Sequence, residues 1–204
     1  MTQRRDFDAA AAAWDEEPRR VKLAGEIAAG IAANVPLSAE WDALDFGCGT
    51  GLVTLPLSQH LGSMVGLDSS DGMLDRLRNK IQALGCKNVH TTLCNLEKGE
   101  LPPGRFHLIT SAMTLHHIPE IVPVLQSLRS LLHPGGWIAL ADLEREDGSF
   151  HDEQTGVFHN GFSAEEFQGM LEKAGFSSIS ISTVSRIEKG ARSFPVLLAT
   201  AQSQ

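Results

Sequence analysis

The chain contains no tyrosine and only three cysteines among its 204 residues. Cys48, Cys86 and Cys94 show no C-x-x-C spacing, so neither a disulfide framework nor a zinc ribbon is predicted, and a reduced, cytoplasmic setting is expected. No apolar run reaches the length of a membrane span. The N-terminus, in which acids interrupt a run of alanines, lacks the pattern of a signal peptide. Neither a membrane location nor secretion is therefore expected.

Positive charge is also scarce, because 17 Lys and Arg stand against 25 Asp and Glu, for a formal net charge of −8. Proteins that bind nucleic acid usually carry a basic stripe that follows the phosphates. Beyond Arg4-Arg5 and Arg19-Arg20 the chain has no such cluster. Nucleic acid is therefore not an expected partner, and the sequence leaves a homodimer open.

The length and composition suit one globular domain, with 42% hydrophobic and 21% charged residues. Residues 7–35 have a helical pattern in which Pro18 suits a first turn. We expect residues 1–38 to form a helical appendage and residues 39–204 to form the main domain. The appendage is either a packing helix or a lid in which Trp14 closes over a ligand.

The main domain alternates short apolar runs with helical patterns, which is typical of an α/β fold with helices on both faces of a doubly wound sheet. Strands are expected at residues 41–46, 63–68, 88–94, 106–113, 137–141, 177–184 and 194–201. Helices are expected at residues 52–61, 73–84, 121–132 and 164–174, with a turn at 133–136. The short connection between the last two strands predicts an antiparallel pair at one edge of the sheet.

Three alternating glycines, Gly47, Gly49 and Gly51, follow the first strand and precede a helix start. This geometry brings a backbone without side chains up to a ligand. A dinucleotide fingerprint would need glycine in place of Leu52, and a phosphate-binding Walker loop would need a following Lys-Ser or Lys-Thr. The second strand ends at Asp68, where a carboxylate can accept hydrogen bonds from a ribose diol.

The combination of Asp45, the G-x-G-x-G loop and Asp68 resembles the S-adenosylmethionine (SAM) site of class I methyltransferases. The segments LHHI (residues 115–118) and LHPGGWIALAD (residues 132–142) are similar to the small-molecule branch of that family, near quinone-biosynthesis C-methyltransferases and uncharacterised relatives. The resemblance implies a Rossmann-like seven-stranded sheet, mostly parallel with an antiparallel last strand. It also implies SAM as the cofactor and S-adenosylhomocysteine (SAH) as the product.

The resemblance assigns roles to particular residues of the site. The loop would hold the methionine end of SAM, Asp68 the ribose, and the residues after the third strand the adenine. The family commonly has Asp where this chain has Asn95, which keeps an acceptor oxygen without the charge. The expected cofactor-binding residues are Asp45, Gly47, Cys48, Gly49, Gly51, Asp68, Ser69, Met73, Asn95, Leu96, Ser111 and Ala112.

Methyl transfer is an in-line displacement, so alignment of the reactants can supply about 7–11 kcal/mol of the barrier reduction. The protein needs a base only if the acceptor must lose a proton. His116, His117 and Asp142 stand where a base would, at strand ends, although each is also a reasonable packing or capping residue. Trp14, His151 and His159 are expected to border the acceptor, and no local spacing supports a metal site.

The sequence therefore predicts a SAM-dependent methyltransferase that acts on a small molecule. Ser111 to Thr114 stand where methyltransferases of nucleobase amino groups carry an Asn/Asp-Pro-Pro-aromatic motif, so base amino groups are not expected acceptors. The alternative is a SAM- or SAH-binding sensor or assembly protein without methyl transfer, which would share every cofactor residue. A nicotinamide-dependent oxidoreductase is disfavoured by Leu52.

Overall fold

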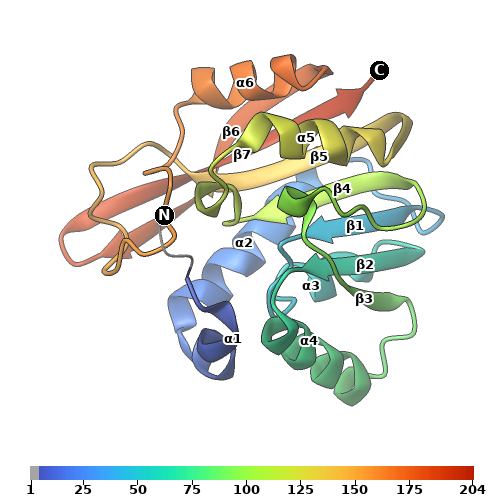
Figure 1. Cartoon of the computed structure of the whole chain (residues 1–204), viewed down its shortest axis with the longest axis horizontal. Coiled ribbons are helices and arrows are strands. Elements are labelled where there is room, and N and C mark those ends of the chain that lie inside the picture. Colours follow the sequence, from blue (N-terminus) through green and yellow to red (C-terminus); the bar gives the residue numbers. More distant parts are fainter. Residues whose placement is uncertain (1–4) are drawn as a thin grey trace.

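The computed structural model describes residues 5–204, and its strands form one seven-stranded sheet in the order β3-β2-β1-β4-β5-β7-β6 (Figure 1). The strands from β3 to β5 pair in parallel, and β7 runs antiparallel to both of its neighbours. This arrangement confirms the predicted Rossmann-like sheet with a reversed last strand. The strands are β1 Asp42–Phe46, β2 Ser63–Asp68, β3 Val89–Leu93, β4 Phe106–Ala112, β5 Leu132–Leu143, β6 Phe176–Lys189 and β7 Arg192–Ser203.

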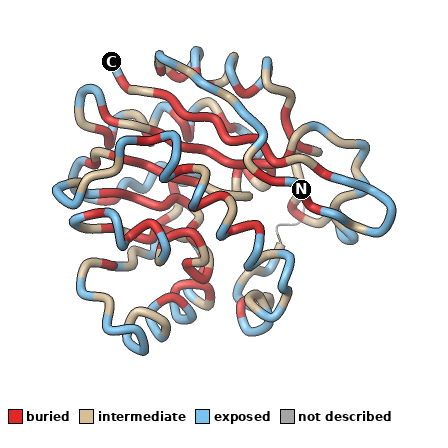
Figure 2. Tube along the Cα trace, turned by 180° about the vertical axis from the view of Figure 1, so that it is seen from behind, coloured by how far each residue is buried: buried red, intermediate tan, exposed pale blue. Residues whose placement is uncertain are grey.

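Helices cover both faces of the sheet, as the strand–helix alternation predicted. One core packs α5 and α6 against the sheet through residues such as Leu128 and Phe167. A second core packs α2 and α3 against the opposite face through Ile31 and Leu57, and Figure 2 shows the buried residues running along the strands between these layers. The helices are α1 Phe7–Ala10, α2 Pro18–Asn34, α3 Thr54–Ser58, α4 Asp71–Leu84, α5 Ile121–Ser130 and α6 Ala164–Lys173.

Local sequence signals set several helix starts as expected. Pro18 lies in the first turn of α2, where its missing N–H costs no hydrogen bond. The Ser70 hydroxyl accepts a hydrogen bond from the backbone N–H of Met73 at 3.1 Å and caps α4. Ser163 and Glu166 form a reciprocal capping box at the start of α6.

Several predicted elements differ from the structure. The helix expected at residues 52–61 is only five residues long, because the glycine turn extends to residue 53. The turn expected at residues 133–136 lies within β5, where Gly135 has a φ of 74° and the pairing with β4 shifts register. β6 and β7 are longer than expected because the mostly polar residues 185–193 continue both strands as a hairpin that turns at Gly190.

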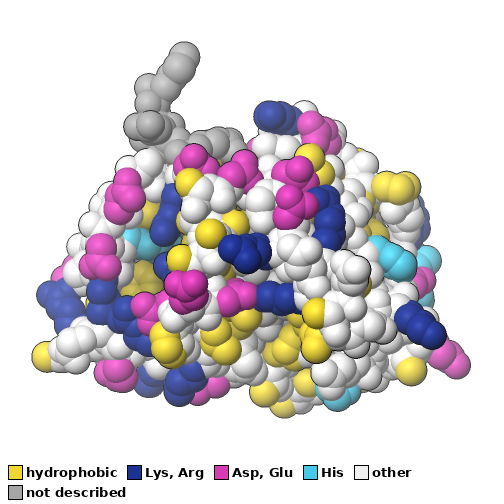
Figure 3. Space-filling view, turned by 90° about the horizontal axis from the view of Figure 1, so that it is seen from below, with side chains coloured by type: hydrophobic (Ala, Val, Ile, Leu, Met, Phe, Trp, Pro, Cys, Tyr) yellow, Lys and Arg dark blue, Asp and Glu magenta, His cyan; other side chains and the backbone are white. Residues whose placement is uncertain are grey.

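Two surface properties follow from these elements. Within residues 5–204, no helix combines the length and the apolar character that crossing a membrane requires. Basic and acidic side chains are intermixed over the face seen in Figure 3, without a continuous basic stripe. The picture therefore offers no broad phosphate-binding surface on that face.

Candidate functional site

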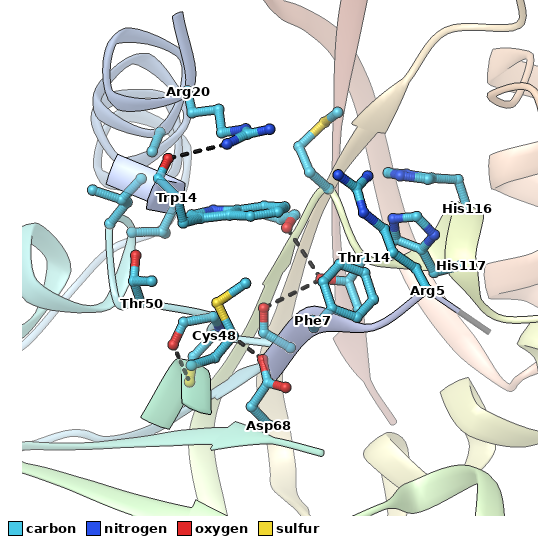
Figure 4. A pocket seen from close by; sticks show the side chains of 18 of the residues that line it. Arg5, Phe7, Trp14, Arg20, Cys48, Thr50, Asp68, Thr114, His116 and His117 are labelled. Atoms are coloured by element: carbon cyan, nitrogen blue, oxygen red, sulfur yellow. Dashed lines mark hydrogen bonds between the residues drawn. The ribbon is translucent and has the colours of Figure 1, made fainter. Parts of the chain in front are cut away.

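A cavity of about 600 Å³ opens beyond the carboxyl ends of β1, β2 and β4, which is where open α/β sheets bind ligands. Its walls come from the glycine loop, the N-terminal segment, the loop after β4 and the loop after β5. Figure 4 shows that side chains from both halves of the chain point into it. The volume lies in the range of small-molecule sites.

Two glycines of the loop have positive φ angles, and neighbouring side chains also leave no room for a Cβ at either position. Gly47 has a φ of 69°, and a Cβ there would lie 2.4 Å from the side chain of Thr114. Gly51 has a φ of 82°, and its Cβ would lie 2.3 Å from Leu77. The backbone N–H groups of Gly47 and Cys48 donate to the Leu67 carbonyl, and those of Gly49 and Gly51 donate to other protein oxygens. These four N–H groups are therefore already used within the protein and are not available to a pyrophosphate.

Asp68, at the end of β2, ties the glycine loop to the start of α4. Its Oδ2 accepts from the Gly49 N–H at 2.8 Å, and its Oδ1 accepts from the Ser70 N–H at 2.9 Å. Burial raises the pKa of Asp68, although these bonds oppose the shift. The carboxylate also lines the cavity, and because a carboxylate has about four acceptor sites, it can still accept from a ligand hydroxyl.

Asp45 lies beneath the loop and is 2% exposed. It accepts hydrogen bonds from the hydroxyls of Thr54, at 2.6 Å, and Thr110, at 2.8 Å. Burial raises its pKa to about 6, and the charge of Asp68 adds to the shift. Two neighbouring carboxylates of this kind favour a cationic ligand in the space above them.

Most of the predicted cofactor residues line the cavity, and two do not. Gly51 faces Leu77, and the Ser111 hydroxyl donates to the Phe46 carbonyl at 2.8 Å, so both support the site from behind. The Asn95 side-chain oxygen accepts from the Glu97 N–H at 3.1 Å and caps a short 3-10 helix. The lining residues from the predicted set are Asp45, Gly47, Cys48, Gly49, Asp68, Ser69, Met73, Asn95, Leu96 and Ala112.

His116 and Asp142 form a buried pair at the ends of β4 and β5. His116 is 2% exposed, and Asp142 is fully buried. The His116 Nδ1 lies 2.7 Å from the Asp142 Oδ1, and the His116 backbone N–H donates to Oδ2. Burial would raise the pKa of Asp142, but the interaction with His116 and the N–H of Leu143 hold it below its ordinary value. The ionised carboxylate fixes the proton on Nδ1, so Nε2 is the nitrogen that His116 presents to the cavity it lines.

Two further histidines lie against this pair. The Nδ1 of His117 lies 2.7 Å from the Gly156 carbonyl, which can only accept, so His117 also presents Nε2 as a base. Burial lowers the pKa of His117 to about 3. His151 packs on His116 at 4.9 Å between ring centroids, and burial lowers its pKa to about 4, with smaller electrostatic contributions from His116 and Arg5. Both rings are therefore neutral at pH 7.

Of the residues predicted to border the methyl acceptor, some line the cavity and others do not. Trp14 and His151 line the cavity. His159 does not, because its Nε2 donates to the Ile118 carbonyl at 2.9 Å and holds the loop after β4. Asp142 lies behind His116 rather than on the cavity wall. Among residues 5–204, no group of three or more His, Cys, Asp and Glu side chains is placed to hold a metal ion.

Replacement of His117 by Gln is expected to reduce the fall in the free energy of unfolding as the pH is lowered. The folded pKa of about 3 lies below the unfolded value, so this ring stabilises the native state fully above about pH 6.5 and loses that contribution as the pH falls. Between pH 7 and 4.5, the variant should lose about 2 kcal/mol less than the wild type in urea unfolding. The raised pKa of Asp45 changes stability with pH in the opposite direction, but it does so in both the wild type and the variant. His60→Gln, on the surface, is the control, and parallel pH curves for His117→Gln and wild type would contradict the prediction.

The N-terminal segment, residues 5–17, is fixed over this cavity by polar contacts. The Asp8 carboxylate accepts from the Ser70 hydroxyl at 2.6 Å and from the Gly72 N–H at 2.8 Å. The Asp15 carboxylate contacts the Thr50 hydroxyl and pairs with Lys80 at 2.5 Å. These contacts join the segment to the glycine loop and to α4, the two elements that border Asp68.

One cavity residue has an unusual conformation, and several others carry no signal in the sequence. Met113 adopts a φ of 55°, which is unusual for a residue with a side chain, at the point where β4 turns into the histidine loop. Thr114 donates its hydroxyl to the carbonyls of Gly47 and Ala112. Phe150 and Lys189 reach the cavity from the far end of the chain. Only their position in space reveals them, because no local pattern marks these residues.

Comparison with known proteins shows a similarity to methyltransferases. A family model described as a methyltransferase domain matches residues 43–136. An uncharacterised methyltransferase of Schizosaccharomyces pombe is 28% identical over 153 residues, which cover 68% of this chain and 54% of that protein. A ubiquinone biosynthesis O-methyltransferase of Pseudomonas aeruginosa is 26% identical over 107 residues, 52% of this chain and 46% of that protein. The chain thus spans about half the length of these two relatives.

Solved structures show the same fold. A SAM-dependent methyltransferase from Aquifex aeolicus is 22% identical with a TM-score of 0.73, covering 97% of this chain and 98% of that one. A putative methyltransferase of Haloferax volcanii, solved in complex with the Trm112 methyltransferase activator, is 16% identical with a TM-score of 0.81, and 98% of each chain is covered.

The residues present fit SAM, the cofactor of these proteins. A Cβ at Gly47 would collide with Thr114, the N–H groups of Gly47, Cys48, Gly49 and Gly51 are already bonded within the protein, and two carboxylates lie beside the loop. Such a site favours an adenosyl sulfonium over a dinucleotide. A methyltransferase domain is thus matched over residues 43–136, and the chain has the fold of SAM-dependent methyltransferases.

Proposed function

We propose that this chain transfers the methyl group of SAM to a small-molecule acceptor. The observation that carries the proposal is the position of Asp68, which lines the cavity while its carboxylate holds both the glycine loop and the start of α4. A ribose diol bound to Asp68 would place the adenine near Met73 and Leu96 and the methionine end along the loop. The cavity volume and the names of the ubiquinone-pathway relatives support a small acceptor.

The chain's own residues would bind the cofactor, exclude water and receive a proton. When bound, SAM supplies an electrophilic methyl group on a sulfonium. Met73 and Leu96 are buried apolar side chains on the cavity wall and would pack against the adenine. Trp14, in the segment fixed by Asp8 and Asp15, would exclude water from above. Asn95 could accept from the adenine amino group through the second lone pair of its side-chain oxygen.

The histidine cluster is suited to take a proton from an acceptor O–H or N–H. His116 and His117 each hold Nδ1 in a hydrogen bond, so Nε2 is the ring nitrogen left to face an acceptor. The proton of the acceptor would pass to the Nε2 of His116 as the acceptor becomes the nucleophile, because a pKa of about 3 makes His117 the weaker base. Asp142 would not touch the acceptor but would keep the His116 ring in its orientation and stabilise the imidazolium that forms.

The proposed setting is the cytoplasm, which is supported by three cysteines that are all unpaired. The acceptor is proposed to be a metabolite rather than a nucleic acid, because side chains of both signs are intermixed on the face seen in Figure 3. Catalysis is proposed to proceed without a metal, since the base and the positioning groups come from the chain itself.

Calorimetry with the full chain tests this function. SAH and SAM are expected to bind with micromolar dissociation constants, and a metabolite extract with labelled SAM should then release SAH. Absence of heat with either ligand would overturn the proposal. Binding without turnover on any extract would replace it with a SAM-binding protein that does not transfer methyl groups.

A further inference from the structure

Two arginines of the cavity lack an anionic partner. Arg5 and Arg20 both line the cavity, and no carboxylate among residues 5–204 lies within ion-pair distance of either guanidinium. Residues 1–4 contain no acid in their sequence. Arg20 makes one hydrogen bond, from Nη1 to the Trp14 carbonyl at 3.2 Å. A guanidinium has five N–H donors, so most of the donors of this pair are free for a ligand.

The other basic side chains of the cavity are neutralised. Arg19 forms a two-pronged pair with Glu17, with nitrogen–oxygen distances of 3.0 and 3.1 Å. Lys189 pairs with Asp152 at 2.6 Å and also donates to a backbone carbonyl. The chain as a whole carries a net charge of −8. A pair of unmatched positive charges inside one cavity is therefore a local exception in an acidic protein.

Arg5 and Arg20 are held near each other by the same aromatic ring. The Arg20 Cζ lies 4.1 Å from the centroid of the Trp14 ring, and the Arg5 Cζ lies 5.6 Å from it. Burial lowers the pKa of Arg20, and the charge of Arg5 is the next largest cause. Two guanidinium groups on one ring repel each other, and a bound anion would convert that repulsion into two attractive contacts.

The position of the pair points to the acceptor rather than to the cofactor. Figure 4 shows the Trp14 ring between Arg20 on one side and Cys48 and Thr50 of the glycine loop on the other. Arg5 lies beside His117 in the same view, away from Asp68. The electrostatic contribution of Arg5 to the pKa of His151 agrees with this placement. The pair thus faces the end of the cavity that holds the histidine bases.

We propose that the methyl acceptor carries an anionic group, a carboxylate or a phosphate, that binds between Arg5 and Arg20 over the Trp14 ring. This inference rests on the proposed methyl transfer and adds the chemical class of the substrate. The anion would orient the acceptor so that its nucleophilic O–H or N–H reaches the Nε2 of His116 or His117. Arg5 and Arg20 are then binding residues that set specificity, not bases.

The first test uses inorganic phosphate and benzoate as probes of the full chain saturated with SAH. Both anions are expected to bind, and benzamide, which lacks the charge, should bind at least 10-fold more weakly than benzoate. Arg20→Gln and Arg5→Gln should each weaken phosphate binding at least 5-fold, and Arg20→Lys should retain part of it. Arg186→Gln removes the same charge from an exposed position of β6 and serves as the control. If phosphate fails to bind, or if all variants bind it equally, the inference is overturned.

The second test separates the acceptor from the carboxylate of the cofactor. SAH and 5′-methylthioadenosine, which lacks that carboxylate, are titrated into the wild type and Arg20→Gln. Both affinities should stay within about twofold between the two proteins. A selective loss of SAH affinity in the variant would assign Arg20 to the cofactor and overturn the inference. Absence of SAH binding by the wild type would instead overturn the proposed function.

The third test concerns the acceptor directly. A metabolite extract is separated on an anion exchanger at pH 8, and SAH release is followed in each fraction. Methyl acceptance is expected in the retained, anionic fraction. Acceptance confined to the unretained fraction would show a neutral or cationic acceptor and would overturn the inference while leaving the methyltransferase activity in place.

Discussion

Replacement of Asp68 by alanine is expected to weaken SAH binding by about 100-fold or more. Hydrogen bonds to a charged group contribute about 1.5–3 kcal/mol each, and two such bonds to a ribose diol would be lost. The same change removes the acceptor of the Gly49 and Ser70 N–H groups. The glycine loop would then lose its tie to α4 as well as its ligand contact. Calorimetry measures the affinity, and thermal melting in the absence of ligand reports the effect on the loop separately.

A neighbouring acid provides the control for this prediction. Asp71, in the first turn of α4, is exposed and pairs with Arg78 at 3.0 Å. Asp71→Ala should leave SAH binding within about twofold. Asp68→Asn keeps the shape and should give an intermediate loss. If Asp68→Ala binds SAH within about threefold of the wild type while it remains folded, Asp68 does not hold the ribose.

The sheet could be predicted because each of its central strands corresponds to a short run of apolar residues in the sequence. Met64 and Leu67 in β2, or Leu108 and Ile109 in β4, stand in short apolar runs that are buried between two layers of helices. The reversed last strand could be expected from the connection at residues 185–193 between the two predicted strands. The full extent of β6 and β7 could not, because these residues are mostly polar and yet continue the strands up to a turn at Gly190.

The cofactor side of the site was predictable for a different reason. A glycine loop and the acid after the next strand are fixed by their order along the chain, and parallel strands bring them to one edge. The role of Asp45 shows the limit of such reasoning. Its partners Thr54 and Thr110 lie 9 and 65 residues away, and no local pattern says that both hydroxyls point at this carboxylate.

The acceptor side depends on contacts between distant segments. Arg5 and Trp14 come from the N-terminal segment and Arg20 from the first turn of α2, whereas His117 and His151 come from two later loops. The sequence marks Trp14 and the histidines as residue types that suit a site, but only the fold brings them to one cavity. The contact of Asp15 with Thr50 and Lys80, which holds this segment in place, also joins residues with no common motif.

Replacement of Asp142 by alanine is expected to destabilise the protein by about 3–5 kcal/mol and to abolish most methyl transfer. The carboxylate is fully buried and accepts from His116 Nδ1 and from the backbone N–H groups of His116 and Leu143. Its removal leaves these buried donors without an acceptor. Removing one partner in this way destabilises a protein more than replacing both partners by apolar side chains. Urea unfolding at pH 7 measures the loss, and a fall in melting temperature of about 10 °C is expected.

The positioning role of Asp142 needs a measurement that stability alone would not change. Asp142→Asn retains an oxygen that can accept from the His116 Nδ1, so it should lose less stability than Asp142→Ala. The amide cannot stabilise an imidazolium, so kcat should fall more than KM changes. Long-range nitrogen–proton NMR should show the His116 proton on Nδ1 in the wild type and a mixture of tautomers in Asp142→Ala. The control is Asp147→Ala, because that exposed acid pairs only with surface groups such as Arg192. A loss of less than 1 kcal/mol in Asp142→Ala, with the His116 tautomer unchanged, would show that the buried pair neither stabilises the fold nor orients the base.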